Sequence, residues 1–467
     1  MEYGLFDFLK LVGSLALFLY GMKIMSDGLQ KLAGNKLRNV LSAMTRNRVM
    51  GVLTGVLISA VIQSSSATTV MVVSFVNAGL LSLVQSIGVI MGANIGTTVT
   101  AWVISLFGFG KFSISALSIP LMGLAIPFIF SSKSKNKSFG EFIFGFAFLF
   151  MGLDFLKDSM PDLQNNPEVL GFVRNFSDNG FLSVLFFLLI GTVLTIIVQS
   201  SSATVALTLI MTAKGWIDFP SAAAMVMGEN IGTTITANLA AIPANISAKR
   251  AAFSHLMFNV LGVVWMLFVF KYFIQMVGGL VENATAVNPN GMTAFLASLS
   301  PQEYATITAT NSSSAIAPEL ADKYKLYLEY QTSTSYGLSL FHTLFNVFNV
   351  SIMIWFVKVY EKICLFVIKP RKGTEDDEEF VLKYIGTGMS SSSELSILQV
   401  EQEVGVYANR VKRMLDFIRE MTNMASNDKE FLKLYNRVEK YEEISDRMEV
   451  EIGNYVAKVS EGRLSNE

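Results

Sequence analysis

Two copies of one polar hexapeptide interrupt otherwise apolar stretches of this chain. The first is Gln63-Ser64-Ser65-Ser66-Ala67-Thr68, and the same six residues recur as Gln199-Ser200-Ser201-Ser202-Ala203-Thr204. Buried hydroxyl and amide groups without partners are costly, so these segments must face protein, water or a ligand. Serine also competes for backbone hydrogen bonds, which favours a break followed by a helix N-terminus. Such an N-terminus suits an oxyanion, whereas freed carbonyl and hydroxyl oxygens suit a hard cation such as Na+.

Each hexapeptide is followed by a second shared motif. Gly92-Ala93-Asn94-Ile95-Gly96-Thr97-Thr98 recurs as Gly228-Glu229-Asn230-Ile231-Gly232-Thr233-Thr234. We interpret each copy as a second break, and we assign its glycines, spaced four residues apart, to close helix packing. Glu229 stands among apolar neighbours, with Ala93 as its counterpart. A cation ligand or a proton carrier is the functional interpretation of Glu229, and a carboxylate that satisfies a neighbouring helix N-terminus is the structural one.

These motifs belong to a longer internal repeat. At a constant offset of 136, residues 55–104 match residues 191–240 at 17 of 50 positions. A weaker similarity, shifted by five residues, links the segment that begins at Phe18 with the segment that begins at Phe148. By the positive-inside rule, the links rich in Lys and Arg are cytoplasmic; they lie near 31–48, 133–137, 249–250 and 369–372. The two copies then cross the membrane in opposite senses, which is typical of a secondary transporter.

The composition divides the chain into an apolar part and a polar part. Of the 467 residues, 52% are hydrophobic and 16% are charged, and 34 of the 73 charged residues lie after residue 370. These proportions exclude an ordinary soluble protein, and the net charge near zero argues against a nucleic-acid binder. The single Cys364 excludes an internal disulfide framework. Apolar segments of spanning length lie near 5–25, 51–79, 80–107, 112–130, 140–158, 181–213, 217–242, 251–278 and 338–368.

The predicted fold is all-α: a polytopic membrane protein with two inverted-topology repeats that contain broken helices and re-entrant hairpins. A transmembrane transport domain covers residues 1–368, with repeat 1 near 5–130, repeat 2 near 140–278 and an extra span at 338–368. We expect an extracellular loop at 282–336, a linker at 369–393 and a cytoplasmic helical domain at 394–467, where the periodicity indicates two or three amphipathic helices.

The two histidines occur in one shared pattern, His-x-x-Phe-Asn. His255 precedes Asn259, and His342 precedes Asn346. The spacing places His and Asn on one helix face. We interpret both as hydrogen-bonded packing pairs between helices, with a role in transport as the alternative.

The paired Gln-Ser-Ser-Ser motifs, each followed by Asn-Ile-Gly-Thr-Thr, resemble those of the sodium-dependent phosphate cotransporters, the type II sodium/phosphate symporters and their bacterial relatives. The resemblance covers about residues 5–365, and residues 441–465 resemble about half of a PhoU-like helical domain. It implies sodium-coupled symport of inorganic phosphate by alternating access in the bacterial inner membrane, a plasma membrane. The animal members that move net charge have an Asp where this chain reads Ser113 to Ser118, so Glu229 would have to supply that charge.

The implied ligands are inorganic phosphate and co-transported sodium ions, in a lipid bilayer and without nucleic acid. The resemblance also implies two kinds of protein partner: a second copy of the chain, in a homodimer, and phosphate-regulon proteins that bind the tail. The predicted substrate-binding residues are Ser64, Ser65, Ser66, Ser200, Ser201, Ser202, Asn94, Thr97, Thr98, Asn230, Thr233 and Thr234. The predicted sodium ligands are Gln63, Gln199, Thr68, Thr204 and Glu229.

Two other functions fit the same residues. A sodium-independent phosphate exporter would use the same anion site, and a phosphate-binding sensor would signal through the tail. An enzyme is disfavoured, because the chain has no Gly-x-Ser-x-Gly motif and neither histidine lies near the serine runs.

Overall fold

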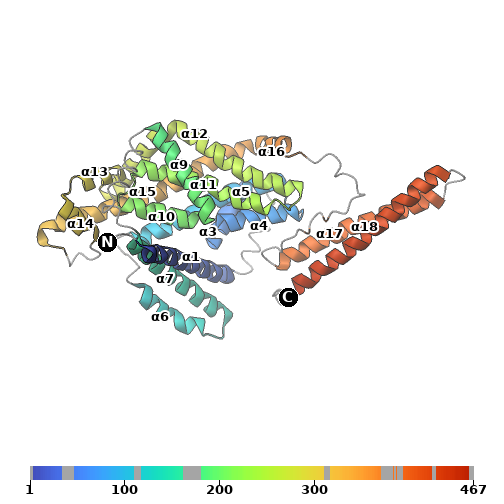
Figure 1. Ribbon diagram of the computed structural model, residues 1–467, viewed down its shortest axis with the longest axis horizontal. Coiled ribbons are helices and arrows are strands. Elements are labelled where there is room, and N and C mark those ends of the chain that lie inside the picture. Colours follow the sequence, from blue (N-terminus) through green and yellow to red (C-terminus); the bar gives the residue numbers. More distant parts are fainter. Residues whose placement is uncertain are drawn as a thin grey trace. The chain divides into compact units, whose positions relative to one another are not determined.

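The computed structural model describes residues 4–33, 47–109, 117–160, 180–309, 316–369, 382, 385, 393–422 and 428–461, which are mostly helical (Figure 1). The predictions for the link at 31–48, for Ser113 to Ser118 and for the linker at 369–393 fall largely outside these residues. The chain forms two compact units. The first contains residues up to 68, 88–236 and 256–355, and the second contains residues 69–87, 237–255 and those from 356 onward.

The helices of the repeat region are α1 (Leu5–Ala33), α3 (Arg48–Ile62), α4 (Ser65–Asn77), α5 (Leu83–Gly108), α6 (Ser118–Ile129), α7 (Ser134–Ser159), α9 (Phe181–Val198), α10 (Ser201–Ala213), α11 (Phe219–Ala240) and α12 (Ile246–Thr285). They are followed by η3 (Pro289–Gly291), α13 (Met292–Ala297), α14 (Pro301–Ala309), η5 (Pro318–Leu320), α15 (Ala321–Met353), η6 (Ile354–Phe356), α16 (Val357–Val367), α17 (Ser393–Thr422) and α18 (Asp428–Glu461).

Within the described residues, five helices are long and apolar enough to cross a membrane: α1, α5, α7, α9 and α12. The apolar helices α3, α4, α6 and α10 are shorter. The predicted segments 51–79 and 181–213 each consist of two of these helices, separated by a break. The protein is therefore a multi-pass membrane protein in which some helices are too short to span alone.

Helices α1 and α7 pack closely and antiparallel in the first unit. A Cβ atom at Gly21 would collide with the backbone of Leu149, and one at Gly152 would collide with the backbone of Phe18. Further along, Ser14 Oγ lies 3.2 Å from Ser159 Oγ. At an offset of 131, Gly21 corresponds to Gly152 and Phe18 to Leu149, so the two contacts are reciprocal. Reciprocal contacts of this kind are typical of a two-fold axis between equivalent elements.

Glycines also set the packing inside each repeat. A Cβ atom at Gly92 on α5 would collide with the carbonyl oxygen of Val52 on α3. The equivalent contact, at the offset of 136 found in the sequence, occurs in the second repeat: a Cβ atom at Gly228 on α11 would collide with the carbonyl oxygen of Leu188 on α9. The predicted packing role of these glycines is therefore confirmed.

We expect Gly92→Ala and Gly228→Ala to lower stability by about 1–3 kcal/mol each, because the added methyl group has no room against a backbone carbonyl. Thermal unfolding of the purified protein in detergent measures the effect. The matched control is Gly123→Ala on α6, where nothing lies within 4 Å of the added atom. Equal melting temperatures for Gly92→Ala and Gly123→Ala would contradict the close approach.

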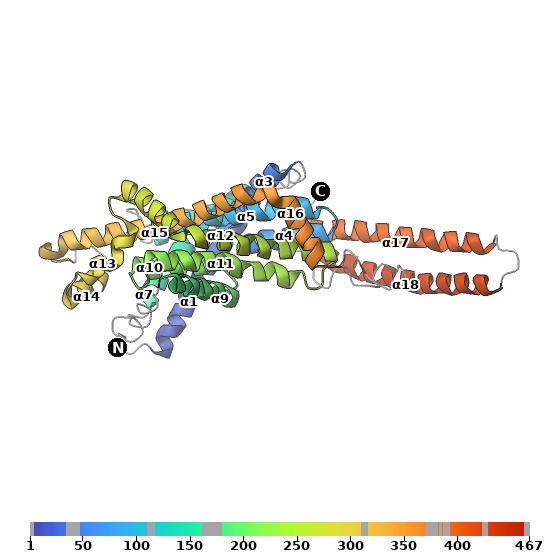
Figure 2. The same ribbon diagram turned by 90° about the horizontal axis from the view of Figure 1, so that it is seen from above.

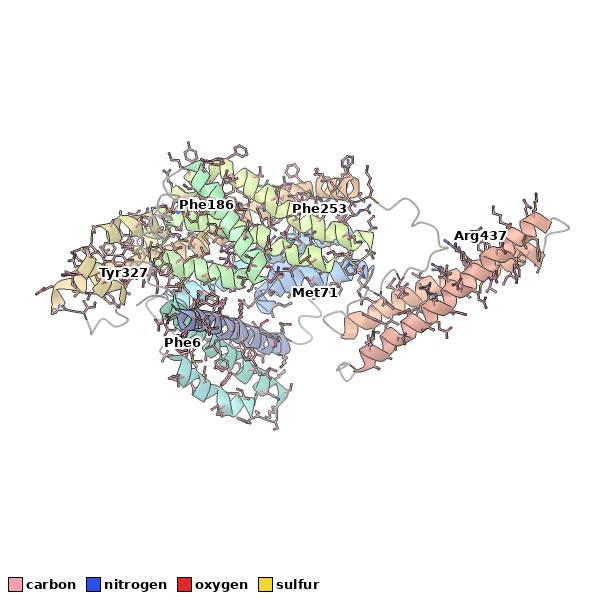
Figure 3. The ribbon with its side chains drawn as sticks, viewed as in Figure 1. Phe6, Met71, Phe186, Phe253, Tyr327 and Arg437 are labelled. Atoms are coloured by element: carbon pink, nitrogen blue, oxygen red, sulfur yellow. The ribbon has the colours of Figure 1, made fainter. Side chains whose placement is uncertain are left out.

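The region predicted as a loop at 282–336 contains helices. α15 begins at Ala321, so it is longer than the predicted span that starts at 338. Tyr327, labelled in Figure 3, lies in an apolar cluster with Met292 and Leu296 of α13. Lys323 Nζ lies 2.6 Å from Glu303 Oε1, and this hydrogen bond, together with hydrogen bonds from Ser300, lowers the pKa of Glu303 to about 2.

The second unit includes a hairpin of two long helices, α17 and α18, which lie side by side in Figures 1 and 2. An apolar cluster that includes Met448 and Ile452 forms its core. Within the hairpin, the Tyr455 hydroxyl donates a hydrogen bond of 2.8 Å to Gln399 Oε1. The described part of the tail therefore contains two long helices, where the periodicity predicted two or three, while its PhoU-like character stays a prediction.

Candidate functional site

All predicted site residues lie in the first compact unit, at two helix breaks and on the helices α5 and α11. α3 ends at Ile62 and α4 begins at Ser65, and α9 ends at Val198 and α10 begins at Ser201. The residue at each break has the left-handed conformation, with φ 53° at Gln63 and 56° at Gln199. Because non-glycine residues seldom adopt positive φ, two such residues at equivalent positions indicate a backbone feature that both repeats share rather than an accident of one loop.

Serine caps the helix that follows each break. Ser64 Oγ accepts a hydrogen bond of 3.1 Å from the N–H of Ala67, and Ser200 Oγ accepts one of 3.3 Å from the N–H of Ala203. The first N–H groups of a helix have no hydrogen-bond acceptor within the helix, and this end of the helix carries a partial positive charge. The break predicted at each Gln-Ser-Ser-Ser motif is therefore confirmed, and each helix N-terminus begins at the second serine.

A glutamine at each break is bonded to the long helix of its own repeat. Thr100 Oγ1 of α5 donates a hydrogen bond of 2.9 Å to Gln63 Oε1, and Thr236 Oγ1 of α11 donates one of 3.2 Å to Gln199 Oε1. Gln63 is buried, whereas Gln199 is exposed. Sequence reasoning missed both threonines. The signal was present, because Thr100 and Thr236 are identical residues at the repeat offset of 136.

Four threonine hydroxyls are committed to their own helices as donors. Thr68 Oγ1 donates to the carbonyl oxygen of Ser64 at 2.9 Å, and Thr204 Oγ1 donates to that of Ser200 at 3.0 Å. In the second motif, Thr97 Oγ1 donates to the carbonyl oxygen of Ala93, and the equivalent Thr233 Oγ1 donates to that of Glu229. A threonine oxygen that has given its proton away offers only lone pairs to a ligand, which suits a cation.

The expected second break is wrong. α5 runs without interruption through Asn94 and Thr98, and α11 does the same through Asn230 and Thr234. The physical reason is that the glycines of the motif let the backbones approach, while the threonine hydroxyls bond to carbonyl groups one turn earlier and leave the helix ladder intact.

Glu229 has no equivalent in the first repeat. Its side chain is 1% exposed, and its Oε1 accepts a hydrogen bond of 2.6 Å from Thr208 Oγ1 on α10. The Oε2 atom is buried and has no hydrogen-bond partner among the described residues. At the repeat offset, Glu229 and Thr208 correspond to Ala93 and Val72, both fully buried and apolar. The second repeat therefore replaces two apolar side chains by a hydroxyl and a carboxyl group.

Asn230 is bonded to α15, which lies outside both repeats. Asn230 Oδ1 lies 3.1 Å from His342 Nε2, and Asn230 Nδ2 donates a hydrogen bond of 3.2 Å to Asn346 Oδ1. The expectation that His342 and Asn346 pair two helices agrees with this geometry. Their partner, however, is a predicted substrate-binding residue, which their sequence spacing alone did not reveal.

The family model described as Na+/Pi-cotransporter matches residues 17–158 and 167–284, which is more than half of the chain. The chain belongs to the Na+/Pi-cotransporter family. This membership agrees with the resemblance carried by the paired motifs. Each of the two matched segments contains one of the two helix breaks.

Relatives of this Na+/Pi-cotransporter family member have different descriptions. The uncharacterized protein YqeW of Bacillus subtilis is 33% identical over 253 residues, which cover 54% of this chain and 78% of YqeW. The putative inorganic phosphate export protein YjbB of Escherichia coli K12 is 32% identical over 256 residues, 54% of this chain and 45% of YjbB. The human sodium-dependent phosphate transport protein 2B is 37% identical over 111 residues, 23% of this chain and 16% of that protein. No solved structure matches this chain.

Proposed function

We propose that this protein carries out sodium-coupled symport of inorganic phosphate across the bacterial plasma membrane, by alternating access. The observation that carries the proposal is the duplicated break. At equivalent positions, each repeat has a glutamine in the left-handed backbone conformation, a serine that caps the next helix, and the N-terminus of that helix. Membership of the Na+/Pi-cotransporter family supports phosphate as the substrate.

The proposed phosphate site uses the serines at the two helix N-termini. Neither Gln-Ser-Ser-Ser motif contains Arg or Lys. Backbone N–H groups and serine hydroxyls would therefore donate to the phosphate oxygens, and the helix dipoles would favour its negative charge. Without a fixed basic side chain, the net charge of the bound anion must be balanced by co-bound cations.

The proposed sodium ligands are the oxygens that cannot donate. Thr68 and Thr204 have given their hydroxyl protons to the helix, and the amide oxygens of Gln63 and Gln199 already accept from a threonine. Hard oxygen ligands of this kind suit Na+. The threonines of the second motif, Thr97, Thr98, Thr233 and Thr234, were predicted above as substrate-binding residues. Their hydroxyl protons are also given to the helix, so we propose that their oxygens contact the sodium ions that accompany the phosphate.

The inverted arrangement of the repeats is part of this proposal. It is supported by the antiparallel packing of α1 against α7, whose contacts are reciprocal at an offset of 131. The repeat itself, as distinct from its inversion, is supported by the equal lengths of α4 and α10, which correspond residue for residue at an offset of 136. Inverted repeats let two conformations of one chain expose the same site to opposite sides of the membrane.

The deciding experiment is uptake of labelled phosphate into proteoliposomes, with inward Na+ compared with inward K+ at zero membrane potential. We expect uptake that requires Na+. Phosphate export is the second candidate, because the relative YjbB is described as a putative inorganic phosphate export protein. Equal phosphate movement in Na+ and K+ would overturn sodium coupling and favour that alternative. Sodium-dependent phosphate binding without any flux would favour a sensor.

A further inference from the structure

α15 has one continuous polar face, and this face is buried inside the protein. The face consists of residues spaced alternately four and three apart, and each is at most 2% exposed. These residues are Ser335, Ser339, His342, Asn346 and Asn349. A buried polar face inside a membrane protein needs partners, because each unpaired polar group is costly there.

The partners of this face lie on the long helices of both repeats. Ser105 Oγ of α5 lies 2.6 Å from Ser339 Oγ and donates a hydrogen bond of 2.9 Å to the carbonyl oxygen of Ser335. Trp102 Nε1, also on α5, donates to Thr343 Oγ1 at 2.9 Å. On α11, the partner is Asn230, a residue of the second motif itself. α15 therefore contacts the site directly in the second repeat.

The direction of each hydrogen bond at Asn230 follows from a single backbone carbonyl group. Asn346 Nδ2 donates a hydrogen bond of 2.9 Å to the carbonyl oxygen of His342, so Asn346 Oδ1 must point at Asn230. Asn230 therefore presents its Nδ2 to Asn346 and its Oδ1 to His342. An oxygen can only accept, so His342 Nε2 must carry the proton that it donates.

This chain of bonds limits what Asn230 can offer to a ligand. Its Oδ1 accepts a hydrogen bond from His342, and one of its two N–H groups donates to Asn346. These two bonds fix the direction of the second N–H group, which is the donor that Asn230 can offer to an oxygen of an anion. Without α15, the amide group could rotate and present its oxygen instead.

We propose that His342, with Asn346, is a positioning residue that holds the Asn230 amide so that it presents an N–H donor to the bound anion. The site then consists of two repeats and a third element, α15, which acts through Asn230. This inference rests on the proposed function, because it assumes that Asn230 contacts the transported phosphate.

The chain contains a matched control for the test. His255 has the same His-x-x-Phe-Asn pattern and is also buried, at 0% exposure against 2% for His342. Phosphate uptake is measured in proteoliposomes for the full-length wild type and for His342→Ala, His342→Gln and His255→Ala. We expect His342→Ala to raise the phosphate KM about three- to tenfold with little change in kcat, which is the effect of losing one orienting hydrogen bond. His342→Gln retains a donor near the position of Nε2, so it should restore most of the KM.

Thermal unfolding in detergent separates positioning from folding. If His342→Ala does not fold, Asn346→Ala, which frees the other side of the Asn230 amide, is expected to raise the KM in the same way. Equal effects of His342→Ala and His255→Ala, or a failure of His342→Gln to restore the KM, would overturn the positioning role while leaving symport intact. A wild type that neither binds nor moves phosphate would overturn the proposed function and this inference with it.

Discussion

The double variant Ser65→Ala with Ser201→Ala is expected to take up phosphate at least about 100-fold more slowly than the wild type. Each serine begins the helix that follows its break. Hydrogen bonds to a charged group contribute about 1.5–3 kcal/mol each, and the two hydroxyls together then account for at least two powers of ten in affinity. Uptake of labelled phosphate under an inward Na+ gradient measures the loss, and each single variant should lose about tenfold.

The fold should tolerate this change, because the capping residues are untouched. Ser64 and Ser200 accept the first-turn N–H bonds, and neither is altered. The matched control is Ser86→Ala: Ser86 is buried on α5 and donates only to its own helix, and its counterpart at the repeat offset is already Ala222. Uptake by the double variant close to that of Ser86→Ala would exclude the serines from the phosphate site.

The second large effect is expected from Thr208→Val with Glu229→Ala, which gives the second repeat the apolar pair that the first repeat has. A carboxylate at 1% exposure, with one hydrogen bond from a threonine, must be neutralised by a bound cation or by a proton, and the proposed role of Glu229 as a sodium ligand selects the cation. We expect the variant to fold and to transport phosphate, with one fewer sodium ion per phosphate. The ratio of labelled sodium to labelled phosphate fluxes measures this number directly.

The same change should alter the response to membrane potential. Moving one elementary charge across the membrane contributes about 2.3 kcal/mol per 100 mV, so the loss of one sodium ion changes the voltage dependence of uptake by that amount. Glu229→Gln separates charge from shape, since it retains the size of the side chain and removes only the carboxylate. A sodium-to-phosphate ratio that is identical in the wild type, in Glu229→Gln and in the double variant would rule out Glu229 as a cation ligand.

The sequence predicted the features of the site that depend on neighbouring residues. Gln63 and Gln199 lie at helix breaks because each precedes three serines that compete for backbone hydrogen bonds, and this effect is local. The continuity of α5 and α11 through Asn94 and Asn230 could not be predicted in this way. There, the carbonyl groups of a neighbouring helix favour glycine, and this contact is tertiary.

Partners that come from distant segments were the least predictable part of the site. Thr208 was indistinguishable from the other hydroxyls of an apolar helix until Glu229 was found 2.6 Å away. His342 had a pattern identical to that of His255, and nothing in that pattern selects Asn230 as the partner of one histidine. Thr100 and Thr236 are the exception, because comparison of the two repeats position by position marks them as shared residues.

The reciprocal packing of α1 against α7 has a consequence for biosynthesis. Gly21 on α1 packs against the backbone of Leu149 on α7, which lies 128 residues later in the chain. At a translation rate of roughly 5–20 residues per second, α7 leaves the ribosome on the order of ten seconds after α1. During that interval α1 must reside in the bilayer with lipid against its glycines, which its apolar composition allows. α1 therefore reaches its final packing only after α7 has been synthesised and has begun to insert.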